Sequence, residues 1–273
     1  MPLTNFQRNI CERLAQSRIA SGESYLAGGA TLNELLAAPR ISRDVDLFHD
    51  TESALDASWQ SDRQLLERDG FKVRVIRERS SFVEVEVRSG SEAVLLQWVR
   101  DSAYRFFPLV RHPELGFTLH PFDLATNKIL ALVGRLEVRD WVDTIECGER
   151  LQPIGYLAWA ACGKDPGFSP LALLEHAART ARYSSEEVQM LAFAGSAPDA
   201  GDLSRRWRSQ LEAARATVAA LPATEVGKCV LDRGGKLVRE PPARLTPAFV
   251  HAELQFHAGA IRGALPQIGS LEA

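Results

Sequence analysis

Two aspartates, Asp44 and Asp46, are separated by a single residue and lie a short distance after the pair Gly28-Gly29. Side chains alternate between the two faces of a strand, so both carboxylates point to one side while their apolar neighbours point to the core. Neighbouring carboxylates repel one another when ionised, and a divalent cation relieves that repulsion. We therefore expect Asp44 and Asp46 to bind a metal ion.

The glycine pair follows a short apolar segment and precedes a helical one. Glycines let backbone N–H groups approach a ligand closely, and the N-terminus of a helix favours phosphates. A metal beside phosphate is typical of nucleotide chemistry, and Mg²⁺ prefers oxygen ligands from carboxylates and phosphates. We expect Gly28, Gly29 and Thr31 to contact a nucleoside triphosphate, with Ser42 ordering the loop. The alternative is a solvated strand edge that carries two acids.

A second group of charged residues surrounds Lys128, which lies in an apolar helical segment of a chain with few lysines. It is a candidate for a phosphate contact, or a lysine whose charge reaches solvent along an apolar face. Asp140 and Asp143 are three apart and share a helix face. They are placed to accept hydrogen bonds from Lys128 or Arg135, or to assist an attacking hydroxyl, and structural ion pairing competes equally. Arg135 is divided in the same way between triphosphate contact and solvated surface.

The elements that must position these residues follow from apolar periodicity. Alternating or apolar runs predict strands over residues 24–27, 45–48, 71–76, 82–87 and 93–99. Helical spacing predicts an opening helix around residues 6–15 and further helices over residues 31–37, 52–68, 154–161, 170–181, 184–192 and 202–221. An Arg-Gly-Gly turn within residues 229–239 predicts a small hairpin. The fold class is α+β, with a mixed sheet of about five strands, flanking helices and a mainly helical C-terminal region.

From this pattern we divide the chain into three parts. Residues 1–115 form the core with the aspartate pair, residues 116–225 form a helical domain that completes the active site, and residues 226–273 form a hairpin and helical tail. At 273 residues with 45% hydrophobic residues, the chain can bury a substantial core.

The composition bears on whether the chain binds nucleic acid or a membrane. The net charge of −3 gives no overall attraction for nucleic acid, so such binding needs a local patch. Arg205-Arg206-Trp207-Arg208 is one candidate, and a solvated helix face around a buried tryptophan is its alternative. The sequence has no apolar run of membrane-helix length, no signal peptide and no paired C-x-x-C cysteines. We expect a cytoplasmic protein with no membrane contact.

Four motifs together resemble a known family. They are L-A-G-G-A-T at 26–31, R-I-S-R-D-V-D-L-F at 40–48, D-L-A-T-N-K-I-L-A-L-V-G-R at 123–135 and R-D-W-V-D at 139–143. This set is similar to the AbiEii/AbiGii toxin family of nucleotidyltransferases, in the polymerase-beta-type superfamily. The resemblance implies a minimal nucleotidyltransferase fold, Mg²⁺ and a nucleoside triphosphate, with some bacterial members modifying tRNA ends and pairing with an antitoxin. It implies as site residues the glycine turn Gly28 and Gly29, the metal pair Asp44 and Asp46, the phosphate lysine Lys128, and either Asp140 or Asp143.

The chain departs from the wider superfamily at one position. A third metal-binding acid often lies on a later strand, where this chain presents Gln97, whose neutral amide cannot offset a metal's charge. Either Glu84 or Glu86 on the neighbouring strand substitutes, or two acids suffice. We expect a Mg²⁺-dependent nucleotidyltransferase toxin with an RNA end as acceptor. The alternatives are a small-molecule or protein acceptor, or a catalytically degenerate protein that binds a nucleotide or a partner.

Overall fold

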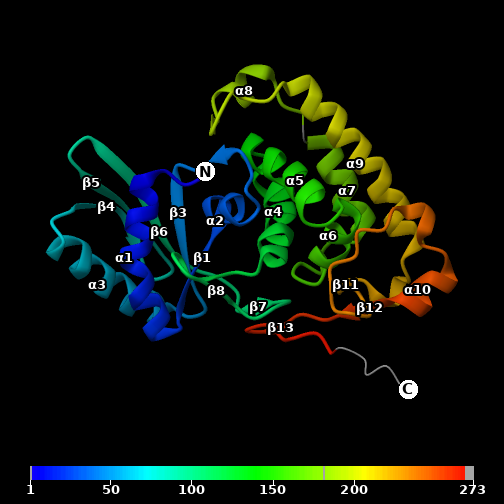
Figure 1. The fold of residues 1–273 in the computed structure, drawn as a ribbon, viewed down its shortest axis with the longest axis horizontal. Coiled ribbons are helices and arrows are strands. Elements are labelled where there is room, and N and C mark those ends of the chain that lie inside the picture. The colour runs from blue at the N-terminus through cyan, green and yellow to red at the C-terminus, as the bar shows by residue number, and fades with distance from the viewer. Residues whose placement is uncertain (1, 181, 268–273) are drawn as a thin grey trace. The chain divides into compact units, whose positions relative to one another are not determined.

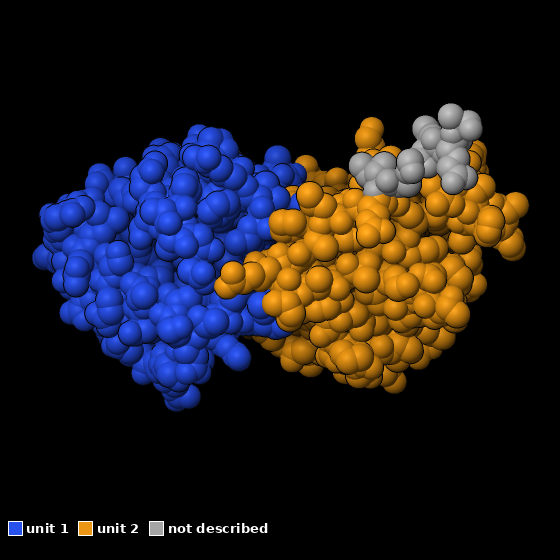
Figure 2. All heavy atoms as spheres, turned by 90° about the horizontal axis from the view of Figure 1, so that it is seen from below, with its two compact units in different colours: residues 1–103, 109–120, 192–195 blue, residues 104–108, 121–191, 196–273 orange. Residues whose placement is uncertain are grey.

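The computed structural model describes residues 2–180 and 182–267, and the chain forms two compact units. Figure 2 colours unit 1, which comprises residues 1–103, 109–120 and 192–195, and unit 2, which comprises residues 104–108, 121–191 and 196–273. Residue 181, at the end of one predicted helix, and residues 268–273, at the end of the predicted tail, lie outside the described residues.

Unit 1 is built around a seven-stranded mixed sheet with the order β4-β5-β6-β3-β1-β9-β8 (Figure 1). Its strands are β1 (Ser24–Ala27), β3 (Asp44–His49), β4 (Lys72–Arg79), β5 (Phe82–Ser89), β6 (Glu92–Arg100), β8 (Val110–His112) and β9 (Gly116–Thr118). Strand β3 runs parallel to β6 and antiparallel to β1. The predicted strands are all present, and the α+β class is confirmed. The short strands β8 and β9 were not predicted, because three residues carry too little alternation.

Three helices flank this sheet: α1 (Asn5–Ser21), α2 (Gly28–Leu35) and α3 (Glu52–Arg68). Helix α1 begins at a capping box, in which Thr4 and Gln7 satisfy each other's backbone N–H groups. Helix α2 begins at Gly28, earlier than the predicted start at residue 31, so both glycines lie in its first turn. A short ladder of β2 (Arg40–Ile41) and β10 (Ala192–Phe193) completes the unit.

The core of unit 1 fixes which face of the sheet is polar. One face of β3, β5 and β6 packs with apolar residues of α1 and α3 in a single cluster, where the Trp59 and Trp98 ring centroids are 4.9 Å apart. Each fully buried large apolar side chain stabilises the fold by about 1.5–3 kcal/mol. Since a one-residue slip in register would exchange the two faces, this packing holds Asp44 and Asp46 on the side opposite the core.

Unit 2 is mainly helical, as predicted for the second half of the chain. Its helices are α4 (Pro121–Arg135), α5 (Val138–Arg150), α6 (Ile154–Ala161), α7 (Pro170–Thr180), α8 (Ser185–Gln189), α9 (Ala200–Ala220) and α10 (Pro247–Glu253), with short 3₁₀ turns η1 (Ala223–Glu225) and η2 (Pro242–Arg244). Every residue of α6 is buried. Two small ladders accompany them: β7 (Tyr104–Arg105) with β13 (Ala260–Ile261), and β11 (Cys229–Asp232) with β12 (Leu254–His257). In the described ranges no helix is both long and apolar enough to cross a membrane.

The predicted small hairpin over residues 229–239 is present in short form: Leu231 bridges Leu237 in antiparallel register, and the Asp232 N–H donates to the Lys236 carbonyl at 2.8 Å across the turn. Strand β11 also pairs along its whole length with β12, a partner that the sequence pattern did not predict. Two consecutive prolines, Pro241 and Pro242, follow this segment and lack the N–H groups that a longer ladder needs. The later strand supplies Leu254 to the same apolar cluster as Val230.

One carboxyl group lies inside the core of unit 1. The side chain of Asp62 on α3 is buried and accepts hydrogen bonds from Trp98 Nε1 at 3.0 Å and from Ser58 Oγ at 3.3 Å. Burial raises the pKa of Asp62 from 3.8 to about 6. In contrast, burial lowers the pKa of the nearby strand residue His49 to about 4.

We predict that Asp62→Asn raises the free energy of unfolding above about pH 6, by roughly 1–3 kcal/mol, and leaves it unchanged below about pH 4. The native pKa of Asp62 exceeds the unfolded one, so between these values the native state holds a proton that the unfolded state releases. The contribution of Asp62 to stability therefore falls as pH rises. The contribution of His49 to the free energy of unfolding changes with pH in the opposite direction. It is the same in the wild type and in Asp62→Asn, so it cancels in the difference between them. Urea unfolding of both proteins across this range measures that difference, and a value independent of pH would contradict a buried proton on Asp62.

Candidate active site

The two aspartates lie on the polar face of β3. Asp44, Asp46 and Phe48 are half-buried, while Val45, Leu47 and His49 between them are buried. The predicted alternation is therefore confirmed. Both carboxylates face away from the core of unit 1, at the strand that lies between β1 and β6.

The glycine turn lies directly against one of these carboxylates. Gly28 has a φ of +69°, and a Cβ built on it would lie 1.6 Å from Asp46 Oδ2. Ala27, the residue before it, pairs with Asp46 in the antiparallel ladder of β1 and β3. Only glycine meets both the left-handed conformation and this close approach. The strand-to-helix turn and the metal-pair candidate thus form one continuous site.

The first turn of α2 adds polar groups next to this contact. Ala27 at the N-cap provides no side-chain acceptor for the backbone N–H groups of the first turn. Gly29 and Thr31 are buried in this helix, and Thr31 Oγ1 has no hydrogen-bond partner among the described residues. Uncapped N–H groups at a helix start favour an anionic ligand.

Ser42 orients Asp44. Its Oγ donates to Asp44 Oδ1 at 2.7 Å, and its carbonyl accepts from Gln7 Nε2 of α1 at 2.7 Å. The serine is buried, so its position is fixed from the core side. The sequence pattern did not indicate this role of Gln7. Its position in α1 shows only that it lies on the buried face of the helix.

Gln97, where the resemblance implies a third acid, lies in the strand beside Asp46. Gln97 on β6 lies opposite Asp46, and Glu84 on β5 lies opposite Gln97. Gln97 Nε2 donates to Glu84 Oε1 at 2.8 Å, so the amide already holds that carboxylate. Glu86 is paired with Arg88 and Arg74, and the hydrogen bond from Arg88 lowers the pKa of Glu86 to about 2.

These donors fit a magnesium ion only in part. Within residues 2–180 and 182–267, no three His, Cys, Asp or Glu side chains are grouped to hold a metal. Asp44 and Asp46 are the candidate donors on this face, where Glu84 is held by Gln97 and Glu86 by two arginines. Mg²⁺ is commonly bound by one or two carboxylates with phosphates and water completing its shell, so this set suits a metal that arrives with a nucleotide.

The second predicted group of residues forms a cluster in unit 2. Lys128 Nζ on α4 lies 2.8 Å from Asp140 Oδ1 and 3.1 Å from Asp143 Oδ2 on α5. Arg135 binds both oxygens of Asp140, at 3.2 and 3.1 Å. The aspartate side chains are fully buried, whereas that of Arg135 is 51% exposed. Both acids are therefore paired with a cation.

The arginines of the predicted basic patch at residues 205–208 differ in whether they are paired with an acid. On α9, Arg205 pairs with Asp202, and Arg206 pairs with Glu146 and Glu149. Trp207 is buried, as the alternative for this segment supposed. Among the described residues Arg208 has no such partner, and it lines a pocket of unit 2 that the sequence pattern did not predict.

No family model and no curated protein sequence matches the chain. The structure is similar to a candidate nucleotidyltransferase from H. pylori, with 14% identity, a TM-score of 0.50, and 80% of this chain and 97% of that chain covered. It is also similar to JHP933 from Helicobacter pylori, with 15% identity, a TM-score of 0.52, and coverage of 80% and 95%.

A further similar structure is MenT4, a nucleotidyltransferase toxin from Mycobacterium tuberculosis H37Rv, with 14% identity, a TM-score of 0.47, and coverage of 80% and 84%. At these identities the two Helicobacter structures establish a shared fold. The chain therefore has the fold found in these proteins, and the resemblance to the AbiEii/AbiGii family stays a prediction.

We predict that Gly28→Ala lowers the free energy of unfolding by roughly 1–3 kcal/mol more than Gly22→Ala. Both glycines have similar positive φ angles, of +69° and +66°, so both variants carry the same cost of left-handed backbone. A Cβ at Gly22 meets nothing within 4 Å, whereas at Gly28 it displaces the Asp46 carboxylate. Chemical unfolding of the two variants tests this, and equal losses would contradict the close contact.

We predict that Lys128→Ala lowers the free energy of unfolding by roughly 3–5 kcal/mol, because two buried carboxylates lose their shared cation. Lys228→Ala is the matched control. Lys228 pairs with Glu225 near the surface, with side chains 36% and 27% exposed, and its loss should cost less than about 1 kcal/mol. Similar unfolding midpoints for the two variants would show that the buried network contributes little.

Proposed function

We propose that this protein is a Mg²⁺-dependent nucleotidyltransferase that transfers a nucleotide from a nucleoside triphosphate to an RNA end, tRNA being the expected acceptor, and that it acts as a bacterial toxin paired with an antitoxin protein. The observation that carries the proposal is the close contact of Gly28 with Asp46. It joins two acids on one strand face to an uncapped helix start. The similar folds of the two Helicobacter structures support the general class.

Asp44 and Asp46 would hold Mg²⁺, which would neutralise charge on the phosphate oxygens of the substrate. Ser42 keeps Asp44 in one orientation through its hydrogen bond. Because Ser42 is buried and oriented from α1, we assign it to positioning Asp44 rather than to direct phosphate contact.

The triphosphate would lie at the start of α2. There the backbone N–H groups of Gly28 and Gly29 can donate to phosphate oxygens, and Thr31 contributes a buried hydroxyl. In the reaction, the acceptor hydroxyl oxygen forms a bond to the α-phosphorus, loses its proton, and displaces pyrophosphate. Such transfer depends mainly on positioning and charge stabilisation, which this turn provides without a covalent intermediate.

Within unit 2 we assign different roles to the predicted residues. Lys128 holds Asp140 and Asp143 in a balanced, buried network that ties α4 to α5. Arg135 is the exposed member, so it is the one we propose for a phosphate contact. Its guanidinium is oriented by two hydrogen bonds to Asp140.

Incubation with each α-labelled nucleoside triphosphate and total bacterial RNA tests the acceptor. Label on RNA that depends on Mg²⁺ supports the proposal. Label on a protein or a small molecule would replace the acceptor and keep the chemistry. Growth arrest on induced expression, relieved by substitution of Asp46, tests the toxin role.

We predict that Asp46→Ala lowers nucleotide transfer by about a thousandfold, since a metal carboxylate stabilises the transition state by several kcal/mol. Its unfolding midpoint should stay close to that of the wild type, because Asp46 is half-buried and faces away from the core. Asp56→Ala, on the exposed side of α3, is the control and should keep full activity. Undiminished transfer by Asp46→Ala would remove the metal assignment.

Gln97 favours one second candidate, a protein that binds nucleotide without catalysis. Its amide occupies the place of a third acid opposite Asp46 and is engaged with Glu84. Calorimetry with Mg²⁺ and each triphosphate separates the two candidates: binding without any transfer supports the degenerate protein, whereas transfer excludes it.

A further inference from the structure

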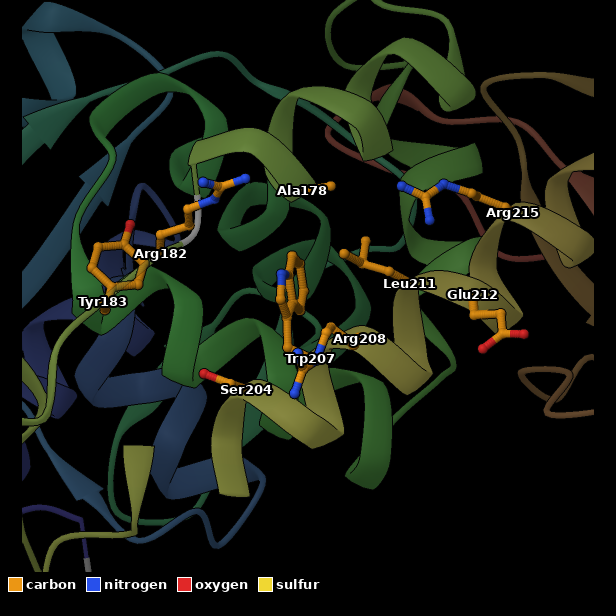
Figure 3. Close-up of a pocket in the computed structure, with 9 residues that line it drawn as sticks. All are labelled: Ala178, Arg182, Tyr183, Ser204, Trp207, Arg208, Leu211, Glu212 and Arg215. Atoms are coloured by element: carbon orange, nitrogen blue, oxygen red, sulfur yellow. The ribbon is translucent and has the colours of Figure 1, made fainter. Parts of the chain in front are cut away.

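Unit 2 contains a pocket of about 820 Å³ that the proposed reaction does not use. Figure 3 shows the nine residues that line it: Ala178, Arg182, Tyr183, Ser204, Trp207, Arg208, Leu211, Glu212 and Arg215. Pockets of about 300–1,000 Å³ are typical of small-molecule and cofactor sites, so this one can enclose a ligand of nucleotide size.

One face of α9 forms most of the wall. The six lining residues of this helix, 204, 207, 208, 211, 212 and 215, recur at helical spacing. Ala178 comes from α7, and Arg182 and Tyr183 come from the segment before α8. In Figure 3 the Trp207 indole stands centrally among these side chains, and the arginines lie around it.

The wall carries polar hydrogens that the protein itself does not use. Trp207 is 4% exposed, and its Nε1 has no hydrogen-bond partner in the described part of the chain. Tyr183 Oη is likewise buried without a partner there. Its ring packs on Trp141 with centroids 5.3 Å apart, and burial raises the pKa of Tyr183 to about 12, so the hydroxyl stays a donor at neutral pH. Buried donors of this kind normally have an acceptor, which suggests a ligand.

The arginines of the pocket are also uncommitted. Across the described ranges, the side chains of Arg182, Arg208 and Arg215 form no ion pair and no hydrogen bond, although Glu212 lies one helical turn from two of them. Their neighbours Arg205 and Arg206 on the same helix are paired with acids. Guanidinium groups bind phosphate oxygens through two parallel hydrogen bonds. The pocket thus gathers three positive groups and several donors with one carboxylate.

We propose that this pocket binds a ribonucleotide unit of a single-stranded RNA, with the arginines and Trp207 Nε1 on a phosphate and Glu212 accepting from the ribose 2′-hydroxyl. The inference rests on the proposed function, because it assigns a second holding point for the RNA acceptor. An acidic protein segment would satisfy the arginines but leave Glu212 facing like charges. A ribonucleotide satisfies both, since it carries an anion and a hydroxyl donor.

The test measures RNA binding directly, without triphosphate and with EDTA present, so that it does not depend on transfer. Fluorescence anisotropy of the full chain with a labelled single-stranded RNA gives the dissociation constant and its salt dependence. We expect Arg208→Ala and Arg215→Ala each to weaken binding about tenfold and to reduce the salt slope by about one. Trp207→Phe should weaken binding about threefold or more.

Arg205→Ala is the matched control, since it removes the same charge from the same helix outside the pocket. It should leave the dissociation constant within about twofold of the wild type. Equal losses for Arg205→Ala and Arg208→Ala would overturn the pocket and indicate a diffuse charged surface. The arginine variants change exposed side chains, so we expect them to fold. Their unfolding midpoints check this.

Two further arms test the choice of ligand. We expect DNA of the same sequence to bind several-fold more weakly than RNA, and Glu212→Gln to remove this preference. Equal binding of RNA and DNA by the wild type, or displacement by poly-glutamate but not by unlabelled RNA, would overturn the proposal. If transfer fails but these binding differences hold, only the proposed reaction is lost; if transfer to RNA occurs but pocket variants bind normally, only this inference fails.

Discussion

The contact between Gly28 and the Asp46 carboxylate is the constraint on which the site depends. A Cβ at this position would lie 1.6 Å from Asp46 Oδ2, so the backbone of the turn occupies the space of a side chain. The contact exists because β1 and β3 are paired with Ala27 opposite Asp46, and that register is fixed by the apolar face packed under α1 and α3. The core therefore determines the distance between the acids and the helix start.

The parts of this arrangement that are local could be predicted from the sequence. Alternation in β3 places Asp44 and Asp46 on one face, and Gly-Gly after a strand indicates a turn, because both signals lie within a few residues. The pairing of Gly28 with Asp46 needs two strands to meet, which no local pattern records. The same reason explains why the longer ladder of Cys229–Asp232 was not predicted: its partner is a strand over Leu254–His257, beyond two prolines.

Positively charged side chains occupy two different environments in unit 2. In the network of α4 and α5, Lys128 is enclosed by Asp140 and Asp143, and removing its charge would take from two buried carboxylates the cation that they share. On α9, Arg208 and Arg215 line a pocket, and no acid of the described residues lies within ion-pair distance of them. The sequence pattern could indicate the pair of Arg205 with Asp202, which lie one turn apart on α9. It could not separate Arg206 from Arg208, because only the packing of α5 brings Glu146 and Glu149 to Arg206.

Three residues paired across β3, β6 and β5, namely Asp46, Gln97 and Glu84, affect how a metal would be held. Gln97 separates Asp46 from Glu84, and its amide donates to Glu84, so the third carboxylate is turned to a neighbour within the sheet. Two carboxylates offset the charge of one divalent cation but leave most of its coordination shell to other oxygens. If the site binds Mg²⁺ as proposed, the phosphates of the nucleotide would supply the ligands that the protein lacks. Metal and nucleotide would then bind together, and the glycine turn, which brings N–H groups to the same place, would join the metal site through the substrate.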